Sequence, residues 1–220
     1  MTGGSTFHAR LTACTSGVAM VEFACCLPFL VAFCMGGVEL TNFTTTKMRI
    51  SQLALQVADN ASRIGTGTVL STKQISEAQI NDLLTGAGFQ AGKLNLYSNG
   101  RVIVSSLEPV ANPNTTNRFR IRWQRCRGSK TWTSSYGNQG TTNLTGATMN
   151  GQVVTAPDAS AVMVVEVAYN YQPLIATTFM PHSQITETAA MTVRDNRDMA
   201  GPTGGVGIYN TENVTASTCS

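Results

Sequence analysis

The stretch VAMVEFACCLPFLVAFCMGGVEL, residues 18–40, decides the fold of this chain of 220 residues. As a helix, it is long enough to cross the hydrocarbon core of a bilayer, which is about 30 Å thick. We therefore predict a transmembrane helix over residues 18–40, preceded by the short polar segment 1–17.

Glu22 is the unusual residue of this helix. A carboxylate in hydrocarbon costs at least ~2.5 kcal/mol, so such a residue usually has a partner or a function. Gly17 stands directly before the four apolar residues that lead to Glu22 and Phe23. A small residue at the membrane face, four apolar residues and Glu-Phe together resemble the processing site of type IV prepilins.

This resemblance implies that a prepilin peptidase cuts between Gly17 and Val18 on the cytoplasmic side and removes residues 1–17 as a leader. The Val18 amine then becomes a new N-terminus, four positions before Glu22. In a filament, Glu22 of one subunit is expected to pair with the Val18 amine of a neighbour. That pairing would relieve two buried charges and set the register between subunits.

A longer match points to one family of pilins. The sequence resembles the TadE-type signature over the run Gly17-x-x-x-Val21-Glu22-Phe23-Ala24-x-x-x-Pro28-Phe29-Leu30. Residues 167–174, VAYNYQPL, resemble it more loosely. The resemblance implies a minor pilin or pseudopilin of a tight-adherence (type IVc) pilus, acting in pilus assembly, surface adhesion and biofilm formation. The implied partners are the prepilin peptidase, other pilins and pseudopilins, and the assembly platform with its ATPase complex.

The same resemblance implies a single-pass protein of the bacterial inner membrane, with its C-terminal domain in the periplasm. It also implies that the protein is not an enzyme. Within the helix, Pro28 is expected to cause a kink or a looser turn, because it removes one backbone hydrogen bond. The distribution of basic residues does not decide the topology, since Arg10 precedes the apolar run while Lys47 and Arg49 follow it.

A second interpretation uses the same residues differently. The apolar run could be a plain signal anchor that keeps residues 1–17, holding an exported β-rich domain that binds a ligand or a polyanion. This interpretation leaves Glu22 without a function.

Helical periodicity continues beyond the membrane segment. Apolar residues recur at helical spacing on one face as Ile50, Leu53, Ala54, Val57, Ala61 and Ile64. We predict that residues 41–64 continue the helix, cover a sheet, and stop before Gly65. A second, short helix is predicted after it, with a capping box at Ser71 and Gln74 and an end at Gly86 or Gly88.

Period-two alternation after Gly92 indicates strands. The candidates are Lys93–Tyr97, Arg101–Leu107, Arg118–Gln124, Val162–Tyr171 and Ile185–Arg194, with turns over 134–151. We predict an α+β, pilin-like fold in which the long N-terminal helix packs on a small, mostly antiparallel sheet. Residues 65–198 would form the periplasmic domain, and residues 199–220 a flexible tail.

The cysteines leave one question open. Cys126 and Cys219 are the two in the polar part of the chain, and an exported domain could join them in a disulfide or keep both as free thiols. No CxxC pair is present, so a zinc ribbon is not expected.

We find no pattern for catalysis, for a metal or for a cofactor. The two histidines, His8 and His182, have no nucleophile motif around them. Charged residues make up 12% of the chain and the net charge is +3, which does not indicate nucleic acid. Arg118, Arg120 and Arg122 could contact a polyanion, but a solvated strand face is the simpler interpretation, with Trp123 on the opposite face by alternation.

Overall fold

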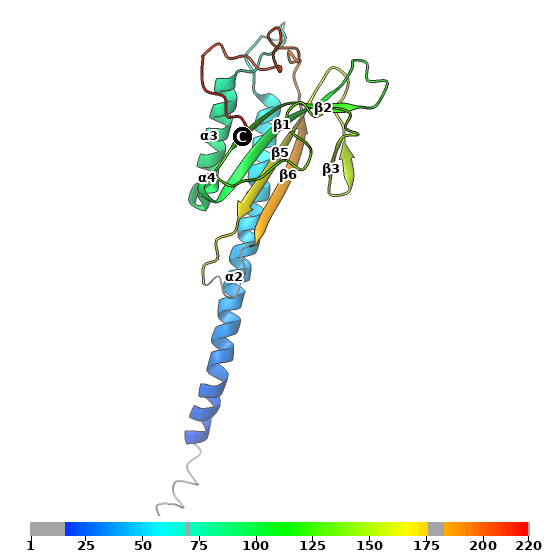
Figure 1. The fold of residues 1–220 in the computed structure, drawn as a ribbon. Coiled ribbons are helices and arrows are strands. Elements are labelled where there is room, and N and C mark those ends of the chain that lie inside the picture. Colours follow the sequence, from blue (N-terminus) through cyan, green and yellow to red (C-terminus); the bar gives the residue numbers. More distant parts are fainter. Residues whose placement is uncertain (1–15, 69–70, 176–182, 220) are drawn as a thin grey trace, which may run out of the picture.

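A single long helix organises the fold. The structure, a computed structural model, describes residues 16–68, 71–175 and 183–219. Helix α2, Ser16–Arg63, runs through 48 residues, a length of about 70 Å at 1.5 Å per residue. Its first half projects from the rest of the chain and its second half packs against a sheet (Figure 1). The predicted α+β architecture is confirmed.

The apolar stripe on the second half of α2 forms one side of the main core. The residues of the predicted stripe from Ile50 to Ala61 are all buried, and Ala58 is buried with them. The helix ends at Arg63, one residue earlier than predicted. Gly65 follows with a φ of 137°, a backbone conformation that favours glycine and that turns the chain away from the helix axis.

Four antiparallel strands form the main sheet in the order β2-β1-β5-β6. Their bounds are β1 Gly100–Pro109, β2 Phe119–Arg127, β5 Val162–Asn170 and β6 Gln184–Thr192. Strands β5 and β6 lie against α2. The alternating residues of β5 point into the core beneath α2 as predicted; they are Met163, Val165, Val167 and Tyr169, followed by Tyr171.

A β-bulge in the β1–β2 pair changes which face each β2 side chain occupies. The register shifts between Ser105 and Leu107, so Arg122 and Trp123 together stand opposite a single β1 residue. As a result Ile121 packs on the sheet face away from α2, whereas Trp123 packs in the α2-facing core. The expectation that Trp123 lies opposite the arginines was therefore wrong.

A small hairpin covers the second face of the sheet. Strand β3, Ala147–Met149, lies in the stretch 134–151 where we expected turns, and it pairs with β4, Gln152–Val154, which follows that stretch. Their residues pack with Leu107, Phe119 and Ile121 in a second apolar cluster. The hairpin covers β1 at Leu107 on this face, and the residues of β1 from Val102 to Glu108 are buried without alternation.

Helix α3, Glu77–Ala91, starts later than predicted. Ser76 is its N-cap and forms a capping box with Gln79, in place of the predicted Ser71 and Gln74. The helix also continues through Gly86 and Gly88 to Ala91. Its apolar residues Ile80, Leu84 and Ala87 face the main core, as expected for a packing helix.

The predicted strand at Lys93–Tyr97 is wrong. A 3₁₀ turn, η1 Gly92–Leu94, and one turn of helix, α4 Leu96–Asn99, occupy this segment. Asn95 between them has a φ of 48°, which breaks the extended path that a strand requires. The alternation of Leu94 and Leu96 suggested a strand, but both residues pack against the main core from this turn.

The C-terminal segment is packed along the domain, which corrects the expectation of a flexible tail. The Tyr209 N–H donates to the Ile75 carbonyl at 2.8 Å, and the Cys126 N–H donates to the Ser217 carbonyl at 2.8 Å. Ile208 is buried in the main core. Residues 199–219 thus run from α3 to the edge strand β2 and contribute to the fold.

Candidate functional site

The first half of α2 is an uncovered apolar surface. Every described side chain from Val18 to Val38 is exposed, and Phe33 reaches 81%. Among the described residues, the helix Gly17–Arg63 is long and apolar enough to cross a membrane. Exposed apolar surface of this extent marks an interaction with a membrane or a partner.

The residues of the predicted processing and assembly site lie on this surface. The Gly17–Val18 bond is in the first turn of α2, which begins at Ser16, and terminal turns are the part of a helix that frays. Val18 and Glu22 are four residues apart and so lie on one face of the helix, beside Phe23. Glu22 is exposed.

The helix passes through Pro28 without a break. Farther along, Gly36 and Gly37 have open space where a side chain would stand. The backbone is therefore bare at Gly36 and Gly37 on the exposed half of α2, and another helix can pack closely against it there.

Glu39 joins the exposed half of α2 to the domain, a role that no pattern in the sequence predicts. Its carboxylate accepts a hydrogen bond from the Tyr171 hydroxyl and from two backbone N–H groups, Leu174 at 3.0 Å and Ile175 at 3.1 Å. Asn42 donates to the same hydroxyl at 2.7 Å. Glu39 is buried, so these bonds fix the segment after β5 to the helix where the apolar surface ends.

The predicted basic row on β2 is divided by the structure. Arg118 precedes the strand and is exposed, whereas Arg120 and Arg122 lie near the buried carboxylate of Glu108, at 3.9 and 3.8 Å. Arg122 also donates to the Ala200 carbonyl at 2.9 Å. The expected solvated face therefore holds only for Arg118. The positive charges of Arg120 and Arg122 lie near the carboxylate of Glu108, and the C-terminal segment contacts Arg122.

Burial raises the pKa of Glu108 to about 7. The Ser106 hydroxyl, 3.0 Å away, and the guanidinium groups of Arg122, Arg120 and Arg197 act in the opposite direction but do not offset the desolvation. The arginine nitrogens stand farther from the carboxylate than a hydrogen bond reaches, which limits their effect. Glu108 therefore exchanges a proton near neutral pH.

This pKa leads to a prediction for stability. Because the folded state holds the Glu108 proton more tightly than the unfolded state, unfolding releases that proton between pH 4.5 and pH 7. We expect the contribution of Glu108 to the free energy of unfolding to fall by about 3 kcal/mol as the pH rises through this window. Urea unfolding of the detergent-solubilised chain across the window measures it. Glu108→Gln should flatten the pH dependence, and Asp82→Asn, an exposed site on α3, should leave it unchanged.

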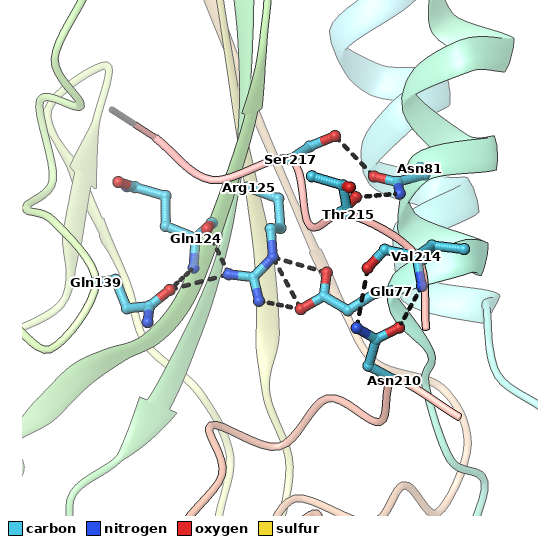
Figure 2. A network of polar contacts seen from close by, with 9 residues as sticks. All are labelled: Glu77, Asn81, Gln124, Arg125, Gln139, Asn210, Val214, Thr215 and Ser217. Atoms are coloured by element: carbon cyan, nitrogen blue, oxygen red, sulfur yellow. Dashed lines mark hydrogen bonds and ion pairs between the residues drawn. The ribbon is translucent and has the colours of Figure 1, made fainter. Parts of the chain in front are cut away.

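A polar network fastens α3 and the C-terminal segment to β2 (Figure 2). Arg125 donates to both carboxylate oxygens of Glu77, and its Nη1 also donates to the Gln139 side chain at 3.0 Å. On α3, Asn81 donates to the Thr215 carbonyl at 2.8 Å and accepts from the Ser217 hydroxyl at 2.7 Å. The side chains of α3, β2 and residues 210–217 converge on one another in this view.

Cys126 and Cys219 form a disulfide in the structure, one of the two alternatives that the sequence left open. The bond fastens the end of the described chain to β2, next to the backbone hydrogen bond between Cys126 and Ser217.

The described residues include no group of three or more histidine, cysteine or acidic side chains placed to hold a metal ion. Both histidines, His8 and His182, lie outside the described residues.

Comparison with known proteins matches the helix that carries this site. Residues 17–63 match the family model described as TadE-like protein. The match begins at Gly17 and ends with the last residue of α2, so it includes Glu22 and Pro28 and leaves the sheet outside. No curated protein and no solved structure gives a significant match.

The apolar, exposed first half of α2 suggests anchoring in a membrane.

Proposed function

We propose that this chain is a minor pilin, or pseudopilin, that takes part in the assembly of a tight-adherence pilus and thereby in surface adhesion and biofilm formation. Residues 18–40 of α2 would hold it in the bacterial inner membrane as a single span, with the α+β domain in the periplasm. Its partners would be the prepilin peptidase, other pilins, and the assembly platform with its ATPase complex. The proposed role is structural and involves no catalysis.

The observation that carries this proposal is the isolated carboxylate on a bare helix. Glu22 is the only charged residue between Val18 and Val38, and it is exposed on a segment that the domain leaves uncovered. In a plain anchor, such a charge would cost at least ~2.5 kcal/mol in hydrocarbon and have no function. In a subunit that packs beside others, the charge of a neighbouring subunit can compensate the Glu22 carboxylate.

The proposed pairing is between Glu22 and the Val18 amine of a neighbouring subunit. Cleavage after Gly17 creates that amine at the end of the helix, where the first N–H groups have no intrahelical acceptors. The helix packing needed to bring two subunits together would use the open backbone at Gly36 and Gly37.

This proposal predicts two separable effects of Glu22→Ala. Processing at Gly17–Val18 should remain normal, because the peptidase acts before assembly. Pilus number should fall at least about tenfold, since the Val18 amine would be left without its partner in the membrane. The mature N-terminus is measured by mass spectrometry of native membranes, and the pili are counted by electron microscopy.

Met20→Ala is the matched control, because Met20 is an exposed residue of the same helix with no charge, and it should be processed and assembled normally. Normal piliation of Glu22→Ala would contradict the pairing. A wild-type N-terminus that stays at Met1 in a host with an active prepilin peptidase would instead favour an unprocessed, membrane-anchored binding protein.

A further inference from the structure

A cavity of about 480 Å³ lies on the sheet face that points away from α2. Its floor includes Ile103 of β1 and Gln124 of β2, and Ile103 faces away from the helix because its neighbours Val102 and Val104 face the α2-side core. Residues 132–134 together with 138 and 139 form one wall, and Thr218 with Cys219 forms part of another. The volume is in the range of small-molecule sites.

One wall of the cavity carries a hydrogen-bond donor that the described protein does not satisfy. Trp132 lines the cavity, and its indole Nε1 is buried with no hydrogen-bond partner among the described residues. This nitrogen has no exposed surface, so a ligand in the cavity would meet the half-buried ring and not this donor. An aromatic ring beside polar groups suits a ligand with an apolar face and polar edges.

Hydrogen bonds fix one end of each of two side-chain amides at the cavity, those of Gln124 and Gln139. Gln139 Oε1 accepts hydrogen bonds from the Gln124 N–H at 3.2 Å and from Arg125 Nη1 at 3.0 Å (Figure 2). Gln124 Nε2 donates to the Ser105 hydroxyl at 2.9 Å and to the Gly137 carbonyl at 3.0 Å. These bonds leave the Gln139 NH₂ group as donor and the Gln124 carbonyl oxygen as acceptor, without further partners in the described part of the chain.

The lining combines an aromatic ring, fixed amides and hydroxyl groups, and it includes one charged residue, Arg101. A sugar ring has apolar C–H faces that pack on an aromatic ring, and each of its hydroxyl groups both donates and accepts hydrogen bonds. A polyphosphate or nucleic acid would require more cationic groups than this lining has. We propose that this cavity binds a saccharide, with Trp132 as the stacking residue and Gln124 and Gln139 as hydrogen-bonding residues.

This inference goes beyond the pilus role and does not depend on it. The cavity is on the far side of the sheet from α2, so subunits that pack through their helices would leave it open. A negative result for Glu22→Ala would leave the saccharide site standing, and a negative result for sugar binding would leave the pilus proposal standing.

The test is saturation-transfer difference NMR on the full chain in phosphocholine micelles, which contain no sugar headgroup. The probes are glucose, galactose, N-acetylglucosamine, rhamnose and glucuronate. We expect transfer to at least one of them, and a loss of affinity of about tenfold or more in Trp132→Ala. Trp132→Phe should retain part of the affinity, because it keeps an aromatic ring of smaller area for stacking.

Two further variants test the site independently. Replacing Cys126 and Cys219 with serine should weaken binding, because it frees the wall formed by Thr218 and residue 219. Phe89→Ala, at an exposed aromatic residue of α3, should bind as the wild type does.

The proposal is overturned if no probe shows transfer to folded protein, or if Trp132→Ala binds sugars unchanged. It is also overturned if a photo-crosslinker at position 133 captures a second copy of the chain while no sugar competes.

Discussion

Replacing Glu77 with alanine is expected to lower the free energy of unfolding by about 3–5 kcal/mol, because it leaves the Arg125 guanidinium buried without its counter-charge. The side chains of Glu77 and Arg125 are only 7% and 5% exposed, so water cannot substitute for the lost carboxylate. Arg125 would retain its bonds to the Gln124 carbonyl and the Gln139 side chain, which do not neutralise it. Urea unfolding followed by circular dichroism measures the loss.

The paired replacement Glu77→Leu with Arg125→Met should be nearly neutral, since it removes both charges and fills the space with apolar groups. Asp82→Ala, at an exposed carboxylate of the same helix, should change stability by no more than about 0.5 kcal/mol. A loss below about 1 kcal/mol in Glu77→Ala would show that the ion pair is solvated, contrary to its burial.

Removing the disulfide is the second large effect that we expect. Cys126 and Cys219 are separated by 93 residues, and in the chain-entropy account a closed loop of that size stabilises the folded state by about 4–5 kcal/mol. Replacing both cysteines with serine should therefore lower the midpoint of urea unfolding strongly. Treatment of the wild type with a reductant should reproduce the change, and the double variant should show no response to reductant.

The free cysteines of the exposed helix provide the control. Cys25, Cys26 and Cys34 are exposed on the first half of α2, and their replacement with serine should not alter unfolding of the domain. Equal stability of the wild type with and without reductant would contradict a disulfide that fastens the C-terminal segment.

The long helix and the central strands could be predicted because burial is periodic in them. The stripe from Ile50 to Ala61 repeats at helical spacing because one face of α2 packs on the sheet. In β5, Val165 and Val167 face α2 while Val164 faces the hairpin side, so the alternation is real even though both faces are apolar.

The errors have local physical causes. Ser71 to Gln74 and Ser76 to Gln79 both fit the capping-box pattern, and tertiary packing selects the second, because Ile75 between them is buried in the core. The bulge near Ser106 leaves no mark in the alternation of β2, since Arg and apolar residues continue to alternate through it. Trp123 was assigned to the wrong face for that reason.

Some of the functional residues could be predicted from the sequence and others could not. Glu22 stood out because a charge in an apolar run is conspicuous in the sequence alone. Glu39 did not, because its partners Tyr171, Leu174 and Ile175 lie more than 130 positions away along the chain. The cavity beside Trp132 was missed as well, since its walls come from β1, β2, a loop and the C-terminal segment.

The continuity of α2 has a mechanical consequence. One continuous helix joins the uncovered apolar segment to the domain, and strands β5 and β6 lie along it (Figure 1). A pull on the domain along this rod would load the contacts from Ile50 to Ala61 in shear, all at once, instead of peeling them apart one at a time. Tension applied at the far end of the sheet would therefore reach the membrane end of the helix with little stretch in between.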